Sequence, residues 1–545
     1  MVADLMSRMK STKVNSEVNS EVKTDGRSAV ASAALPAVTS AATSAVTPAI
    51  RCRRAGGSWG ALGLGTALLA SLAACTIGPD YSRPPTTVPA AFKEAPAGWK
   101  VAQPADHQPR GAWWKIFNDP VLDGLIERAN SANQSIASYQ AAYRQAGALV
   151  AEAHSSYFPT LSASGSATRS GSGSRTSGVN VGGGSNVANS YSTSLDASWE
   201  PDLWGSVSRT VASERASQQS AEADLANARL SVQGTLAEDY FQLRSLDSAQ
   251  DLYDRTVASY QRSLQLTQNR YAVGVAGRAD VIQAQTSLQS AQASATDNQV
   301  NRATYEHAIA VLVGEPASTF SLPPAPLDAA PPTIPLTLPS ALLERRPDVA
   351  SAERSAASAN EQIGVAQAAY FPTLTLSGSG GFTAADFANW LTAPARVWSL
   401  GPQLAATIFD GGLRHARVEA ARAAYDQAAA TYRAAVLTAF QDVEDNLSTL
   451  RILASEEVIQ RQAVASAEQA LAIVTNEYKA GTTTFLDVLT SQATAFTAER
   501  SLVDIQGRRM VAAAGLIKAL GGDWGGLGTT VADAQPQKQN DAVNK

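Results

Sequence analysis

The chain repeats itself at long range, and this duplication restricts the folds that it can adopt. The segment Tyr157–Leu161 recurs letter for letter as Tyr370–Leu374, 213 positions later. Seven further residues recur 207 positions later: Asn269, Tyr271, Gly274, Asp280, Val281, Gln285 and Gly314 reappear as Asn476, Tyr478, Gly481, Asp487, Val488, Gln492 and Gly521. Solenoids and propellers have units of about 20 to 50 residues, so a period of this length excludes them. The sequence predicts two copies of one large unit.

Each copy contains two segments in which apolar and small polar residues alternate. In the first copy the alternation runs over residues 161–167 and again over 191–199. In the second copy it runs over 374–382 and over 398–408, where Pro402 is an irregularity. A period of two predicts half-apolar β-strands, here four strands of roughly ten residues. The Gly/Ser-rich segment 171–185 predicts a loop between the first two strands.

Long helices are predicted around these strands. Asn118-Asp119-Pro120 offers a cap and a proline for the first turn, so we expect a helix from there to about Ala153. Residues 205–272 and 411–480 contain no proline, and their apolar residues fall at steps of three and four. This spacing is typical of a coiled-coil seam, although an ordinary soluble bundle has it too. Each stretch would be about 100 Å long as an unbroken helix, and each is followed by a glycine turn and a shorter helix, ending near Val313 and Ala519.

The predicted strands have the length and alternation of transmembrane β-strands, although surface strands of a soluble sandwich can look the same. Four strands cannot close a barrel. An open edge in lipid leaves backbone N–H and C=O groups unpaired, at several kcal/mol each. If the strands span a membrane, the chain must therefore oligomerise, and three copies would give twelve strands around one shared pore.

The N-terminal region has the order of a secretory signal. Three arginines, Arg51, Arg53 and Arg54, precede an apolar run over 61–70 that ends in Leu72-Ala73-Ala74-Cys75. A membrane-spanning helix is the alternative, because residues 55–79 carry no charge, but the glycines and Pro79 weaken it. The Leu-Ala-Ala-Cys ending resembles a bacterial lipoprotein box, whose cleavage would leave Cys75 as an acylated first residue. Thr76 in the next position, rather than Asp, favours sorting to the outer membrane.

The inventory of reactive residues argues against an enzyme. Two cysteines, Cys52 and Cys75, and four scattered histidines cannot build a zinc cluster or a disulfide framework. No Ser/His/Asp grouping, phosphate loop or metal-ligand spacing is found in the sequence. The 48 acidic residues outnumber the 43 basic ones, which removes the main electrostatic reason to expect nucleic-acid binding. We predict a non-enzyme with no cofactor other than a covalent lipid on Cys75, and no catalytic or metal site.

Several motifs together carry a family resemblance: Cys75–Pro84, Trp113-Trp114 with Phe117–Pro120, Leu343–Val349 and the two Tyr-Phe-Pro-Thr-Leu copies. As a set they resemble the outer-membrane factor family of tripartite exporters, the TolC-like proteins. The similarity is to the lipoprotein branch of the NodT and OprM type, which serves resistance-nodulation-division pumps. The match covers roughly residues 75 to 525, and it is specific as a set although each motif alone is weak.

The resemblance implies a fold class that is mainly α with a transmembrane β-barrel. The duplicated unit would assemble as a homotrimer with a 12-stranded β-barrel and a 12-helix α-barrel as a periplasmic tunnel. It implies a location in the cell outer membrane, lipid-anchored and spanning, extending into the periplasm. The implied partners are a periplasmic adaptor (membrane fusion) protein, an inner-membrane resistance-nodulation-division pump and outer-membrane lipid, with no nucleic acid.

The resemblance also places a gate at the periplasmic tip, in the turns 271–277 and 478–484. Glycines at Gly274, Gly277 and Gly481 permit the tight reversal. Asp280 matches the family's tip aspartate that accepts bonds from the neighbouring inner helix pair, and Tyr478 is the expected donor. Asp487 matches a lumen-facing aspartate, three copies of which would form a ring that attracts cations. Capping of the following helix is an alternative role for both aspartates, and neither role excludes the other.

Two departures from the family pattern concern this gate. Thr483 stands where the best-known members have an arginine of the closing network, and Thr490 replaces a second aspartate of the ring. The closing network is then weaker in this chain, or Arg278 contributes to it instead.

These observations divide the chain into six parts: a leader and lipoprotein signal peptide (1–74), a lipidated N-terminal segment (75–119), a first repeat (120–322), a Pro-rich linker (323–339), a second repeat (340–525) and a disordered C-terminal tail (526–545). We predict the outer-membrane channel of a tripartite efflux pump, which passively conducts small hydrophobic or amphiphilic compounds to the exterior. Four methionines, three of them within residues 1–9, argue against metal-ion export. An exit duct for type I protein secretion and a periplasmic coiled-coil scaffold lipoprotein without a pore are the alternatives.

Overall fold

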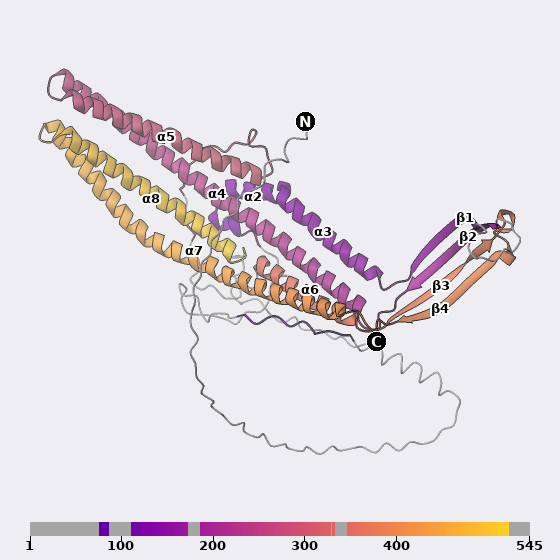
Figure 1. Ribbon diagram of the computed structural model, residues 1–545. Coiled ribbons are helices and arrows are strands. Elements are labelled where there is room, and N and C mark those ends of the chain that lie inside the picture. Colours follow the sequence, from indigo (N-terminus) through magenta and orange to yellow (C-terminus); the bar gives the residue numbers. More distant parts are fainter. Residues whose placement is uncertain (1–75, 87–110, 173–185, 329, 333–345, 523–545) are drawn as a thin grey trace, which may run out of the picture. The chain divides into compact units, whose positions relative to one another are not determined.

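The two copies share a succession of helical segment, two strands and two long helices, but the first copy has two helices where the second has one (Figure 1). The computed structural model describes residues 76–86, 111–172, 186–328, 330–332 and 346–522. The first copy contains α2 (Pro120–Ala132), α3 (Gln134–Ser155), β1 (Thr160–Ser172), β2 (Asn186–Trp199), α4 (Ser206–Ala272) and α5 (Arg278–Leu312). The second contains α6 (Pro347–Ala368), β3 (Thr373–Ala384), β4 (Arg396–Ala405), α7 (Leu413–Ala480) and α8 (Phe485–Ala519). The predicted duplication is therefore confirmed at the level of secondary structure.

The prediction of one helix from residue 118 to about 153 was wrong, because the chain breaks at Asn133. This residue is extended (φ −66°, ψ 125°), and its side-chain oxygen accepts bonds from the backbone N–H groups of Ser135 and Ile136. Its side-chain nitrogen donates to the carbonyl of Leu312 in α5 at 2.8 Å. Asparagine competes in this way with the helical backbone, so it ends α2 and caps α3.

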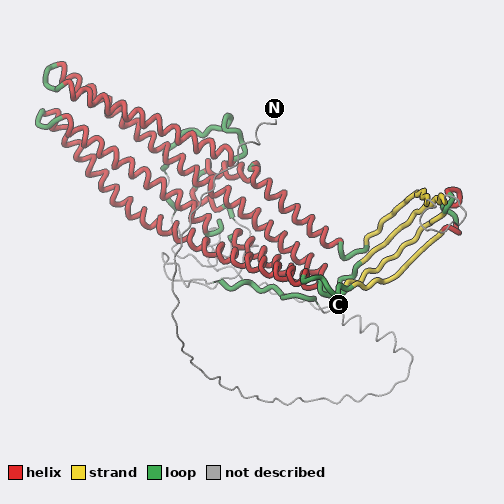
Figure 2. The backbone as a smooth tube through the Cα atoms, viewed as in Figure 1, coloured by secondary structure: helices red, strands yellow, loops and turns green. Residues whose placement is uncertain are grey.

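The four strands form one antiparallel sheet in the order β1-β2-β3-β4 (Figure 2). All four lie where the alternation predicted them. β4 ends at Ala405, so Ile408 lies beyond the sheet, contrary to the predicted end. Pro402 is part of β4, which is an edge strand and therefore tolerates a residue without an N–H group. β1 extends to Ser172, into the segment predicted as a loop, and residues 173–185 lie outside the described part.

The two long helices are continuous, as predicted. α4 has 67 residues and α7 has 68, which corresponds to about 100 Å each. α5 returns along α4 and α8 returns along α7 (Figure 1). No helix within the described residues is both long and apolar enough to cross a membrane.

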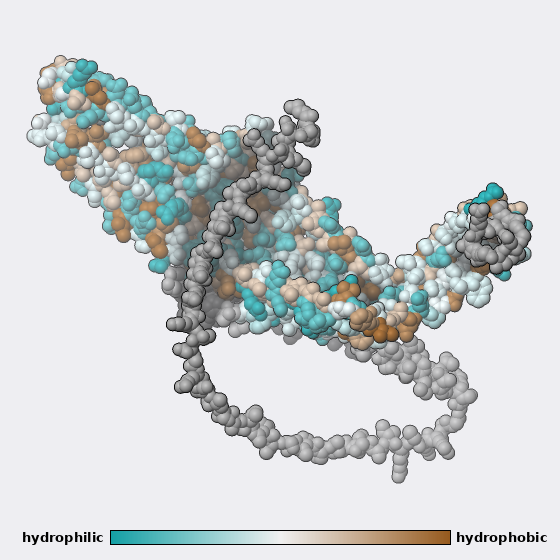
Figure 3. Space-filling model, in the orientation of Figure 1, coloured by the Kyte–Doolittle hydropathy of each residue, from teal (hydrophilic) through white to brown (hydrophobic). Residues whose placement is uncertain are grey.

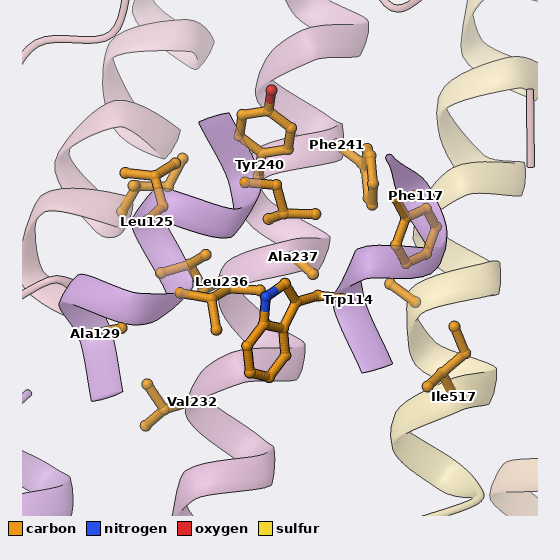
Figure 4. Packing of buried hydrophobic residues seen from close by; sticks show 14 of the residues in the cluster. Trp114, Phe117, Leu125, Ala129, Val232, Leu236, Ala237, Tyr240, Phe241 and Ile517 are labelled. Atoms are coloured by element: carbon orange, nitrogen blue, oxygen red, sulfur yellow. The ribbon is translucent and has the colours of Figure 1, made fainter. Parts of the chain in front are cut away.

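The main hydrophobic core surrounds the middle of α4 (Figure 4). The helical turn η1 (Trp113–Phe117) and the helix α2 pack here against α4 and the end of α8. Phe117 and Phe241 have ring centroids 4.7 Å apart, and Leu236 is fully buried beside them. The Trp-Trp motif of the sequence is thus a core element that joins the N-terminal segment to both repeats.

A group of buried charges fixes the start of the linker between the repeats. Asp247 of α4 accepts bonds from Arg244 at 3.0 Å and from Arg302 of α5 at 2.6 Å. The same two guanidinium groups donate to the backbone carbonyls of Pro323 and Leu322, at 2.8 and 2.7 Å. The described part of the predicted linker contains no helix or strand, and the rest lies outside the described residues. The chain that leaves the first repeat is therefore held by ion pairs rather than by secondary structure.

Replacing the central anion of this group tests its contribution to stability. Asp247→Ala leaves two largely buried guanidinium groups without the anion that joins them, so we expect the free energy of unfolding to fall by about 3–5 kcal/mol. The matched control is Asp251→Ala, one turn further along α4, because Asp251 and its partner Arg255 are both exposed. That variant should lose less than about 1 kcal/mol. Denaturation of the two purified variants, followed by circular dichroism, measures both free energies of unfolding. Equal losses in the two variants would contradict the stabilising role of Asp247.

Candidate functional site

The sheet has one hydroxyl-rich face and one apolar face. Pairs of serines face each other across the strands, with Oγ–Oγ distances of 2.8 Å for Ser164 with Ser194 and for Ser379 with Ser399. Most residues of the other parity are apolar, and the register brings them side by side on the opposite face: Leu161, Ala163, Leu195, Ala197, Trp199, Leu374, Leu376, Phe382, Trp398, Leu400 and Leu404. The sheet can therefore separate an aqueous side from a hydrocarbon side.

Aromatic residues gather at both ends of this sheet. At the end next to the helices, the indole of Trp199 donates to the carbonyl of Tyr157, and Trp204 stacks on Phe371 with centroids 5.0 Å apart. We call these four residues the helix-end girdle. At the other end, the ring centroid of Tyr191 lies 5.5 Å from that of Phe387 and 6.1 Å from that of Trp390. We call these three residues the loop-end girdle.

The spacing of the two girdles is that of a membrane. Tyr191 and Trp199 are eight residues apart on β2, or about 27 Å along the strand. A strand tilt of about 40° reduces this to roughly 20 Å across the membrane, close to the apolar band of transmembrane barrels.

The edges of the sheet are open within the described chain. β1 and β4 are the outer strands, and each pairs with one neighbour only. Each edge therefore presents a row of backbone groups without a strand partner, and one polypeptide is an incomplete membrane structure.

An extended N-terminal strap, residues 76–86, lies against the helices close to the helix-end girdle. The N–H of Ile77 donates to the carbonyl of Trp204, and Arg209 of α4 bonds both Asp80 and the carbonyl of Gly78. Gly78 has a φ of +117°, and a Cβ there would lie 2.6 Å from the Cα of Gly364, so only glycine fits. The strap thus begins where β2 passes into α4. Cys75, the predicted lipidation site, lies outside the described residues.

The helix pairs turn at the glycines that the sequence predicted, with one exception. Gly274 and Gly481 have φ values of +75° and +81°, which favour glycine. Gly277 has an ordinary φ of −78°, so the backbone there does not require glycine. Arg278 is the first residue of α5 and is exposed.

Both tip aspartates close capping interactions within the chain. Asp280 accepts a bond from the backbone N–H of Gly277 at 3.0 Å. Asp487 accepts bonds from the hydroxyl and the N–H of Thr484, at 2.6 and 3.1 Å, and from the hydroxyl of Thr483 at 2.8 Å. The hydroxyl of Thr484 is the main reason why the pKa of Asp487 lies below its usual value, and the hydroxyl of Thr483 adds to it. Both aspartates therefore cap the helix that follows them, and the hydroxyl of Thr483 takes part in the cap of α8.

Tyr478 is buried at the end of α7, in a position that the gate hypothesis did not specify. Its side chain packs with Ala284, Phe485 and Val488 in a small core, and within the described chain its hydroxyl has no hydrogen-bond partner. Within the described chain Asp280 and Tyr478 do not form a hydrogen bond with each other.

The structure adds Arg270, which sequence reasoning missed. Its guanidinium lies 4.5 Å from the centroid of the Tyr478 ring and donates to the carbonyl of Tyr478 at 2.8 Å. Arg270 thereby ties the end of α4 to the end of α7. One feature of the sequence could have drawn attention to Arg270: the equivalent position of the second repeat is Glu477, so the charge is reversed between the copies.

Arg270→Ala tests this tie between the helix pairs. A charge-assisted bond of about 1.5–3 kcal/mol disappears, so amides at the α7 end should exchange hydrogen about ten- to a hundredfold faster. The reporting amides are those of Gly481 and Thr482, which bond back to the last turn of α7. Arg262→Ala, on the exposed surface of the same helix, is the control and should leave their exchange unchanged. Unchanged exchange in Arg270→Ala would contradict the tie.

Comparisons with known proteins agree with this arrangement. A family model described as "Outer membrane efflux protein" matches residues 125–315 and 338–522. The chain is 34% identical over 438 residues to the pyoverdine export outer membrane protein OpmQ of Pseudomonas aeruginosa, covering 79% of this chain and 91% of that protein. It is 28% identical over 463 residues to the toluene efflux pump outer membrane protein TtgC of Pseudomonas putida, covering 83% and 93%. The solved structure of the outer-membrane channel OprN superposes with a TM-score of 0.75, at 30% identity, over 83% of this chain and all of that one.

Proposed function

This chain belongs to the outer membrane efflux protein family, and we propose that three copies of it form one conduit from the periplasm to the exterior. Its role is that of an outer-membrane channel protein in efflux, and it extends into the periplasm. The proposed role is passive and includes no chemical step. The two relatives reported above are named for pyoverdine and toluene, so we propose small amphiphilic organic compounds as cargo.

The two-faced, open-edged sheet is the observation that carries the trimer proposal. In lipid the apolar face and its two girdles must point outward, and the serines must point into a pore. The edge of β4 in one copy then pairs with the edge of β1 in the next, which removes all free edges in a closed ring. Three copies supply twelve strands, and α4, α5, α7 and α8 of each copy supply the twelve helices of the tunnel.

The tips of the helix pairs are proposed as the gate and as the contact for a periplasmic adaptor. Val273 and Val275 in the first turn have side chains that are 74% and 63% exposed, which suits an apolar docking contact. An inner-membrane resistance-nodulation-division pump would supply the energy. At rest Tyr478 would donate to Asp280 of the neighbouring subunit, Asp487 would face the pore, and Arg278 would assist the closure.

The position of the strap supports a lipid anchor at Cys75. Gly205, at the start of α4, lies so close to the strap that a Cβ there would be 3.2 Å from the Cα of Thr76. Thr76 is therefore held at the junction of sheet and helix, near the helix-end girdle. A lipid on the preceding residue would enter the inner leaflet at that level without distorting the strap.

Conductance of the purified protein in planar bilayers tests the channel and its gate. We expect a trimer with a small resting conductance, raised several-fold by Asp280→Ala together with Tyr478→Phe because the contact between neighbours is lost. Tyr478→Phe alone separates gating from capping, because it leaves the bond of Asp280 to Gly277 intact. An unchanged current in both variants would remove these residues from the gate. A monomer that passes no current would contradict the proposed function itself.

Labelling with radioactive palmitate tests the anchor. Cys75→Ser should abolish incorporation, because acylation requires the thiol, whereas Cys52→Ser should leave it unchanged. The Cys75 variant should still fractionate with the outer membrane, because the strands remain. Labelling that persists in Cys75→Ser would show that the lipoprotein box is wrongly assigned.

A further inference from the structure

The four strands carry only three charged side chains within their described residues, and these are divided between the two faces. Asp196 has the parity of the serines and accepts a bond from Ser194 at 2.7 Å, so it belongs to the hydroxyl-rich face. Arg169 and Arg396 have the opposite parity. Arg169 is two residues beyond Ala167, the partner of Tyr191, and Arg396 is paired with Phe382. Both arginines are exposed and lie on the predominantly apolar face, which also carries Thr193 and Asn189.

Both arginines also lie at the same end of the sheet, away from the helices. Arg169 comes two residue pairs after the level of Tyr191 in the loop-end girdle. Arg396 is the first residue of β4 and follows the connection that contains Phe387 and Trp390. Through Phe382, Arg396 is level with Thr193 on β2, whereas Arg169 is level with Asn189, so the two arginines lie on either side of the level of Tyr191. In the proposed orientation this end reaches the outer leaflet, so both guanidinium groups lie near the headgroup region.

Arg169 lies on the edge strand β1, and Arg396 lies on the other edge strand, β4. Within one chain β1 and β4 are separated by β2 and β3. When β4 pairs with the neighbouring β1, Arg396 and Arg169 of the partner subunit lie on adjacent strands and on the same face. The ring then carries three such pairs, one at each junction between subunits.

We propose that each junction binds a phosphate group of an anionic lipid of the outer leaflet through Arg169 and Arg396. A guanidinium group facing lipid costs free energy unless an anion is near, and the cost is smallest at the headgroup level. Arginine binds phosphate with two parallel hydrogen bonds, which makes it better suited to this site than lysine. No other cationic side chain lies on the described strands, so the site would be confined to the junctions. This inference rests on the proposed trimer.

Binding of diphosphorylated lipid A to the delipidated, detergent-solubilised protein tests the site. Native mass spectrometry counts bound molecules during a titration. We expect binding to the wild type to be at least about tenfold tighter than to Arg169→Gln/Arg396→Gln, because two charge-assisted contacts are lost. Arg262→Gln/Arg417→Gln removes the same charge from exposed helix positions and should bind as the wild type does. Dephosphorylated lipid A should not distinguish the variants.

The outcomes separate this inference from the proposed function. A wild type that forms a conducting trimer but binds lipid A no more tightly than the Arg169/Arg396 double variant would overturn the lipid site alone. An equal loss in the Arg262/Arg417 variant would overturn it too, because binding would then follow net charge. Should the double variant fail to assemble, Arg169→Lys and Arg396→Lys keep the charge but not the paired hydrogen bonds. Each should weaken binding within an intact trimer, and unweakened binding would again overturn the site.

Discussion

Every backbone N–H and C=O group of a strand in lipid must be paired, and most of this structure follows from that requirement. The sheet of one chain satisfies it for β2 and β3 but not for the outer sides of β1 and β4. The pairing of β2 with β3, over Tyr191–Trp199 and Leu376–Ala384, also joins the two repeats, so the duplication supplies one continuous four-stranded sheet rather than two separate hairpins. The unpaired outer sides are the reason for the proposed pairing of each chain with its neighbours.

Charged side chains are distributed differently on the strands and on the helices. On the strands charge is nearly absent, whereas the helices bury several ions and pair each of them. Arg346 at the start of α6 bonds Asp348, Asp442 of α7 and the carbonyl of Ala519 in α8. A buried charge is tolerated only with such partners, and losing one of them is costly. Each cluster therefore holds several segments in register, which suits a protein whose long helices must keep a fixed alignment.

The sequence predicted those parts of the fold that depend on the local spacing of apolar residues along the chain. Alternation located all four strands, and the proline-free stretches located α4 and α7 nearly to the residue. The sequence did not predict the break at Asn133, because the break depends on a contact with Leu312, almost 180 positions away. The role of Arg270 was not predicted for the same reason, since its partner Tyr478 belongs to the other repeat. The tip aspartates were found by position, and within the described chain they make capping bonds, whereas the contacts of the proposed gate would lie between chains.

The two repeats preserve a local structure while diverging in surface chemistry, and the tips make this clearest. Both turns place a glycine in the left-handed region and an aspartate at the third position of the following helix. Around this shared frame the first turn exposes valines, whereas the second exposes Thr482 and Thr484. The surface view shows apolar and polar patches side by side at these ends (Figure 3). In the proposed ring of three chains the two kinds of tip would alternate, so a docking partner would meet two distinct surfaces in turn. The duplication has thus preserved the geometry of the tips but not their chemistry.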